Sequence, residues 1–133
     1  MEKDAQKLQQ KYMDLQMIDQ QMKQMQQQIQ LIESQINEIV ITKEAINSLK
    51  NTKTDSEILA PISGGIFIKG TLTDNQKLAV NVGSGTVVEK TIPEVIKIIE
   101  EQETEINKTY NTLIAELQNL GTKAIQIEQE ISK

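Results

Sequence analysis

Apolar residues recur every seven positions along the first fifty residues of this sequence. One register holds Leu8, Leu15, Met22, Ile29 and Ile36, and a second, three residues later, holds Ile18, Met25, Ile32, Ile39 and Ile46. This spacing is the a and d pattern of a coiled coil, interrupted only by Lys11 and Lys43. Because the stretch also lacks Gly and Pro, it predicts a helix over residues 1–53, ~75 Å long at ~1.5 Å per residue.

The last forty residues have the same seven-residue apolar period. Their two registers are Ile96, Glu103, Tyr110, Leu117, Ala124 and Ile131, and Ile99, Ile106, Leu113, Leu120 and Ile127. Pro93 suits the first turn of a helix, and a single Gly121 is expected to loosen the repeat without ending it. A second helix is therefore predicted over residues 93–133. The expected seam between the helices consists of Met22, Met25, Ile29, Ile32, Ile36, Ile39, Ile99, Ile106, Tyr110, Leu113, Leu117 and Leu120.

Between the helices, over residues 54–92, the apolar period changes from seven to two. Ile66, Ile68 and Leu72 share one face of an alternating run, and Leu78, Val80 and Val82 share one face of another. Ser63-Gly64-Gly65 and Gly83-Ser84-Gly85 have the composition of tight turns. The segment therefore predicts two hairpins, with strands at about 57–62, 65–72, 77–82 and 86–92.

Two long helices that flank short strands can fold back on each other as an antiparallel coiled coil. The expected fold is α+β and mainly α, with the two β-hairpins at the base. Ile46 would then lie near Ile96 and Ile99, and the first helix would extend past the second by about one heptad. Leu8 and Tyr12 would have little opposite them. This predicts either a frayed terminus or an apolar tip that binds a partner.

The hairpins pose a second packing problem. Two-stranded hairpins are marginal in water, and their apolar faces need cover. We expect the strands to complete a sheet or barrel with other subunits through Ile66, Phe67, Ile68, Leu78, Val80 and Val82. The alternative is a small sandwich that closes on the ends of its own helices.

The amino-acid composition argues against several kinds of catalytic and binding site. The chain of 133 residues has no His, Cys or Trp, its basic residues are all Lys, and its net charge is −5. These absences remove the usual nucleophilic triads and zinc sites, so we expect no enzyme, no metal and no cofactor. An acidic chain without Arg is a poor binder of nucleic acid. A polar first segment and the lack of a long apolar run predict a cytoplasmic protein without a secretion signal or a membrane span.

Two stretches of the hairpin segment have a distinctive sequence. In the first, Glu57-Ile58-Leu59-Ala60-Pro61 leads into Gly64-Gly65-Ile66-Phe67-Ile68-Lys69-Gly70, and in the second, Val80-Asn81-Val82-Gly83-Ser84-Gly85 precedes Val88-Glu89-Lys90-Thr91. These two stretches resemble the two hairpins of the alpha class of archaeal prefoldin. Two hairpins rather than one favour the alpha class over the beta class.

The resemblance implies an ATP-independent chaperone. Two alpha and four beta subunits would form a hexamer on an intersubunit β-barrel, hold unfolded client proteins at the coiled-coil tips and pass them to a group II chaperonin. The tip residues carried over by position are Leu8, Tyr12, Leu15, Ile125, Ile127 and Ile131. Met13 and Met17 are further candidates for an adaptable apolar patch. The alternative function is a structural coiled-coil protein, such as a prefoldin-like subunit that forms filaments.

Overall fold

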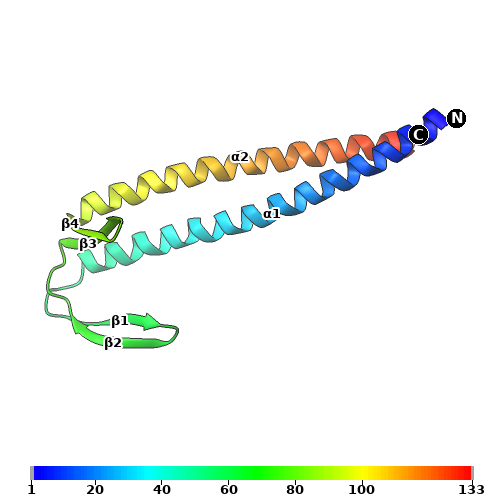
Figure 1. Cartoon of the computed structure of the whole chain (residues 1–133). Helices are drawn as coiled ribbons and strands as arrows, with labels where there is room; N and C mark the ends of the chain where they lie inside the picture. The colour runs from blue at the N-terminus through cyan, green and yellow to red at the C-terminus, as the bar shows by residue number, and fades with distance from the viewer. Residues whose placement is uncertain (1, 133) are drawn as a thin grey trace. The chain divides into compact units, whose positions relative to one another are not determined.

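The computed structural model describes residues 2–132, in which a long helix precedes four short strands and a second long helix follows them in the sequence (Figure 1). The elements are α1 (Glu2–Lys50), β1 (Glu57–Ser63), β2 (Ile66–Thr71), β3 (Lys77–Gly83), β4 (Thr86–Thr91) and α2 (Ile92–Ser132). This confirms the mainly helical α+β fold and the two hairpins. The division into functional segments 1–53, 54–92 and 93–133 stays a prediction.

The chain divides into two units, which are described separately. One holds the residues up to Asn37 and those from Thr104 onward, and we call it the terminal unit. The other, Glu38–Glu103, contains both hairpins and is called the hairpin unit.

The terminal unit is an antiparallel pair of helices. Lys11 Nζ lies 3.5 Å from Glu130 Oε2, and the Tyr110 hydroxyl donates to Glu33 Oε1 over 3.3 Å. Residue numbers on α2 therefore fall as those on α1 rise. Lys11 of α1 lies opposite Glu130 of α2. The overhang of about one heptad stays a prediction.

Gly121 does not interrupt α2, as the heptads predict. A Cβ added there would lie 3.8 Å from the Met22 methyl carbon, which is an ordinary van der Waals distance. The glycine is therefore not required by close approach of the two helices.

The core of the hairpin unit lies where the two helices meet β3. Ile46, Ile92, Val95 and Ile99 form a buried cluster. Ile39, Ile96, Leu78 and Val80 pack against it. The expected proximity of Ile46 to Ile96 and Ile99 is confirmed. The buried set of Ile46, Ile92, Val95 and Ile99 is called the helix-end cluster.

The start of α2 carries a helix cap beside this cluster. The Glu94 N–H donates to Thr91 Oγ1 over 3.4 Å, which satisfies one of the free amides of the first turn. Pro93 lies in that turn, where its missing N–H costs no hydrogen bond within the helix.

The polar residues at the apolar heptad positions have partners across the coil. Lys43 Nζ lies 3.3 Å from Glu103 Oε1 in the hairpin unit, and each side chain is 27% exposed. In the terminal unit Lys11 pairs with Glu130. Each interruption seen in the sequence is therefore compensated by an opposite charge on the other helix.

Each hairpin forms its own two-stranded antiparallel sheet. Glu57 pairs with Thr71 at the open end of the first hairpin, and Lys77 pairs with Thr91 in the second. Gly65 has a φ of 80° in the first turn, a left-handed value that glycine adopts without strain.

Candidate functional site

The tip of the terminal unit exposes part of its apolar surface. Leu8 is 42% exposed, Tyr12 52% and Ile125 56%. Leu15, Ile127 and Ile131, the other expected tip residues, are partly buried. The structure therefore separates side chains that are open to a ligand from side chains that also pack in the coil. A role of these residues in client binding stays a prediction.

Two methionines enlarge this exposed surface. Met13 and Met17 lie one helical turn apart on α1 and are 51% and 58% exposed. Unbranched methionine side chains adapt to irregular apolar partners. Their exposure fits the patch that the sequence suggested.

A shallow hollow of about 260 Å³ lies on the flank of the terminal unit. Its lining residues are Asp14, Met17, Ile18, Gln21, Leu120, Lys123 and Ile127. The hollow joins residues of both helices, so the heptad pattern alone could not locate it. Its aliphatic lining, with one acidic and one basic side chain, suits an apolar side chain of a bound peptide.

The hairpins carry the second exposed apolar surface. Ile66, Phe67, Ile68 and Val82 are all more than half exposed. Leu78 and Val80, expected in the same set, pack instead against the helix-end cluster of their own chain. The assembly role of these six residues stays a prediction, although the second hairpin already has intramolecular cover on part of one face.

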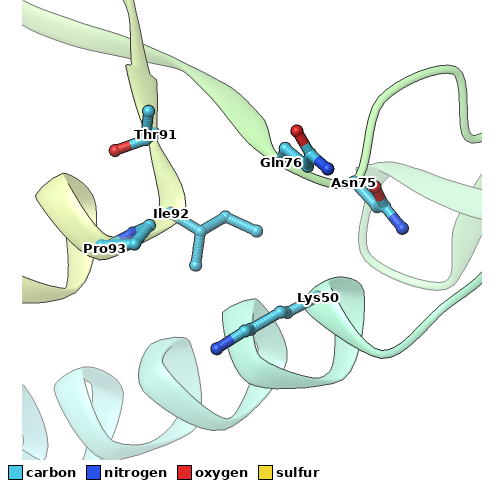
Figure 2. Close-up of a pocket in the computed structure, with 6 residues that line it drawn as sticks. All are labelled: Lys50, Asn75, Gln76, Thr91, Ile92 and Pro93. Carbon is cyan, nitrogen blue, oxygen red and sulfur yellow. The ribbon is translucent and has the colours of Figure 1, made fainter.

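A pocket of about 350 Å³ opens beside the first turn of α2 and is mainly apolar. Figure 2 shows the Ile92 side chain directed into the space between Lys50 and the Asn75–Gln76 segment. Asn75 Nδ2 donates to the Thr52 carbonyl, and the Gln76 carbonyl accepts from the Ile92 N–H. These polar groups maintain the loop structure, and the lining brings no acid and base together.

The turn between the hairpins is held by Asp74. The backbone N–H groups of Gln76 and Lys77 donate to Asp74 Oδ1 over 2.7 Å and 3.2 Å. These hydrogen bonds lower the pKa of the Asp74 carboxyl, the bond from Gln76 having the larger effect. The carboxylate therefore has a structural role in ordering the chain before β3.

Two features of other protein classes are missing from residues 2–132. No group of three or more acidic side chains is placed to hold a metal ion. Within the same residues, neither helix has a stretch apolar enough to cross a bilayer.

The family comparison agrees with the fold. The family model described as Prefoldin subunit matches residues 18–133, which is most of the chain. The chain belongs to the prefoldin family. Prefoldins are chaperones rather than a known enzyme family.

Curated archaeal prefoldin subunits are similar over most of this prefoldin chain. The prefoldin subunit alpha of Methanococcus vannielii is 29% identical over 126 residues, covering 95% of this chain and 84% of the relative. That of Pyrococcus horikoshii is 36% identical over 104 residues, covering 71% and 70%. These relatives support the alpha-class resemblance of the hairpins.

A solved structure shows the same fold. The cryo-EM structure of filamentous PFD from Methanocaldococcus jannaschii superposes with a TM-score of 0.77 and 19% identity. The match covers 92% of this chain and 98% of that one. At this identity the likeness concerns the arrangement of helices and hairpins.

Proposed function

We propose that this chain is a subunit of an ATP-independent holdase that binds unfolded proteins at its coiled-coil tip and delivers them to a group II chaperonin. The observation that supports this most is the exposed apolar tip in a prefoldin-family chain. Leu8 and Tyr12 lie near the start of α1, and about half of each side chain is exposed. Non-native proteins expose apolar segments that can bind such side chains.

The energy of such a contact is small. Burying an aliphatic or aromatic side chain completely gives ~1.5–3 kcal/mol, and side chains about half exposed here gain about half of that. Two or three such contacts total ~1.5–4.5 kcal/mol before the cost of association, so a single tip should bind a client with millimolar affinity or more weakly. Several tips that bind one client together raise the effective affinity, and weak individual contacts allow release without a nucleotide.

Assembly of several subunits would bring several coiled-coil tips together. We infer that the hairpins join this chain to beta-class prefoldin subunits, two alpha with four beta, on an intersubunit β-barrel. Two-stranded sheets with exposed aliphatic residues are unstable alone in water, which supports a partner on this surface. The curated relatives named prefoldin subunit alpha agree with an alpha role in that assembly.

The test compares two matched variants of α1 in the complex with a beta-class subunit. Leu8→Ser with Tyr12→Ser removes exposed apolar surface, whereas Gln9→Ser with Gln16→Ser alters polar positions of the same helix. Light scattering of a guanidine-denatured protein after dilution, without ATP, measures the holding activity. The apolar double variant should suppress aggregation several-fold less well, and the glutamine variant should match the wild type. Equal activity of all three complexes contradicts the tip assignment.

The alternative is a structural, filament-forming role. It is favoured by a fold shared with the filamentous PFD structure. Long fibres formed by this chain alone, visible by negative-stain electron microscopy, would support that role over the hexamer.

A further inference from the structure

A groove runs along one flank of the terminal unit. The hollow described above has a neighbour of about 180 Å³ on the same pair of helices. The lining of this second hollow is Gln21, Gln24, Met25, Gln28 and Leu120. Because Gln21 and Leu120 line both hollows, the two form one groove between α1 and α2, which we call the flank groove.

The floor of the flank groove is apolar. Ile18 and Met25 of α1 occupy heptad positions, as do Leu120 and Ile127 of α2, and all four side chains are partly buried. The apolar surface that they leave open lies at the bottom of the groove rather than on the outer surface of either helix.

Two exposed apolar side chains lie along the α1 edge of the groove. Met17, Gln24 and Leu31 are seven residues apart and therefore lie in one line along the helix. Met17 and Gln24 line the two hollows, so Leu31 continues the same edge. Met17 is 58% exposed and Leu31 66% exposed. The fourteen residues between them span ~21 Å of helix.

Three glutamines line the groove between these apolar residues. Gln21, Gln24 and Gln28 are exposed, and no other group within residues 2–132 forms a hydrogen bond with their side-chain amides. Each amide has an oxygen that accepts and an NH₂ group that donates. The peptide backbone offers the complementary N–H and carbonyl groups.

Charge distinguishes the two flanks of α1. The positions of α1 that line the flank groove carry no charge from Met17 to Leu31. The other flank of α1 carries Asp19, Lys23 and Glu33 over the same length. On the α2 side of the groove, Lys123 lines one hollow and Glu116 stands seven residues before it, so their charges cancel. A neutral ligand with hydrogen-bonding groups fits this surface best.

We propose that the flank groove binds an extended, uncharged segment of an unfolded protein and forms hydrogen bonds to its backbone through Gln21, Gln24 and Gln28. The glutamine oxygens accept from client N–H groups, and the glutamine NH₂ groups donate to client carbonyls. In a folded protein these backbone groups are already paired, so the groove selects chains that lack secondary structure. This inference rests on the proposed holding function and specifies which feature of a client is recognised.

The length of the groove defines the segment that fits it. An extended chain rises ~3.4 Å per residue, so the ~21 Å between Met17 and Leu31 corresponds to about six residues. Side chains six residues apart in an extended chain point to the same side. Two apolar side chains at this spacing can therefore contact both exposed residues of the α1 edge, while the backbone between them lies beside the glutamines.

Titration of the full-length chain with peptides tests the contact. The chain is used alone so that the tips of partner subunits do not contribute, and binding is followed by NMR. One peptide of seven residues has leucine at both ends and serine and alanine between them, and a second carries N-methyl groups on its central amides. The first should shift the side-chain amide signals of Gln21, Gln24 and Gln28. N-methylation removes backbone donors and should raise the dissociation constant at least about threefold.

A groove variant tests whether the glutamines make this contact. It combines Gln21→Leu, Gln24→Leu and Gln28→Leu, which add apolar surface but remove the amides. A gain in affinity is expected from apolar surface alone, whereas the proposed hydrogen bonds predict a loss of at least about threefold. N-methylation of the peptide should then have little further effect, because the groups that it disrupts are already missing.

The matched control places the same substitutions on the other flank. Gln16→Leu, Gln26→Leu and Gln30→Leu add equal apolar surface there and should leave the effect of N-methylation unchanged. Alanine at the three groove positions provides a second test without added apolar surface, and it should weaken binding as leucine does. Both residues are good helix formers, so circular dichroism should be unchanged.

The outcomes separate this inference from the proposed function. Equal effects of N-methylation on the wild-type chain and the groove variant would show that the glutamines do not contact the backbone. Tighter binding of the same peptide locked as a helix would show that the groove accepts a helix, and no shift at millimolar peptide would show that it is not a site. Each of these results overturns the inference alone if the complex with the beta-class subunit still suppresses aggregation. If that complex also fails to suppress aggregation, both are overturned.

Discussion

The Lys43–Glu103 pair offers a sharp test of how the coil is held together. Both residues occupy positions of the seam where the repeat otherwise has apolar side chains, and the charged atoms are 3.3 Å apart. Each side chain is 27% exposed, so the pair is neither a free surface contact nor fully buried. Glu103→Ala leaves the Lys43 ammonium partly desolvated without this partner. Surface pairs contribute ~0–1 kcal/mol and breaking a fully buried pair costs ~3–5 kcal/mol, so we expect a loss of ~1–2 kcal/mol.

The double variant Lys43→Leu with Glu103→Leu should behave in the opposite way. Two leucines at these seam positions would bury apolar surface worth ~1–2 kcal/mol each, and no charge would remain to be desolvated. The expected result is a net gain of ~1–3 kcal/mol, in line with replacements of buried ion pairs by apolar residues. A change of sign between the single and the double substitution is the diagnostic feature.

Urea unfolding followed by far-UV circular dichroism measures these changes. All variants are compared at one protein concentration, because self-association would shift the apparent stability. Lys11→Ala serves as the control, since Lys11 and Glu130 are 36% and 57% exposed and should contribute less than ~1 kcal/mol. If Lys43→Ala and Glu103→Ala are additive within ~0.3 kcal/mol in the double alanine variant, the two residues are not coupled and the reasoning is wrong.

Three further predictions concern packing, helix propensity and pH. Ile92→Ala removes a side chain that is 4% exposed in the helix-end cluster, and urea unfolding should show a loss of ~2–4 kcal/mol; a loss below ~1 kcal/mol would contradict tight packing there. Gly121→Ala should raise stability in the same assay by ~0.5–1 kcal/mol, because a Cβ fits at that site; destabilisation would show that the coil cannot accommodate it. Hydrogen bonds from Gln76 and Lys77 lower the pKa of Asp74, so they stabilise the turn above the unfolded pKa near ~3.9 and are lost as pH falls through the lower folded pKa. An NMR titration of Asp74 should have its midpoint below that of an unfolded peptide, and an equal or higher midpoint would refute the effect.

Much of this fold could be predicted because its signals are local. The seven-residue period identifies both helices, and antiparallel packing then places Ile46 near Ile96 and Ile99. The alternation and the glycine turns locate the hairpins for the same reason. The pairing of Lys43 with Glu103 could not be predicted from either helix alone, because it depends on the stagger between the two helices.

The candidate surfaces were less predictable. Periodicity identifies an apolar face but does not show what covers it. Leu78 and Val80 carry the same alternation as Ile66 and Ile68, yet they contact the chain's own helix ends while Ile66 and Ile68 are exposed. At the tip, Leu15 packs partly in the coil although it shares a register with the exposed Leu8. The exposure of a side chain on one helix depends on how the other helix of the chain packs against it. The sequence of one helix does not specify that packing.

The mass of the assembly in solution is the most direct test of the proposed hexamer. Light scattering coupled to size exclusion should be recorded for this 15.0 kDa chain alone and after mixing with the beta-class subunit of the same organism. The mixture should give one discrete species that contains two copies of this chain and four of the partner. Separate elution of the two proteins at their individual masses would contradict it.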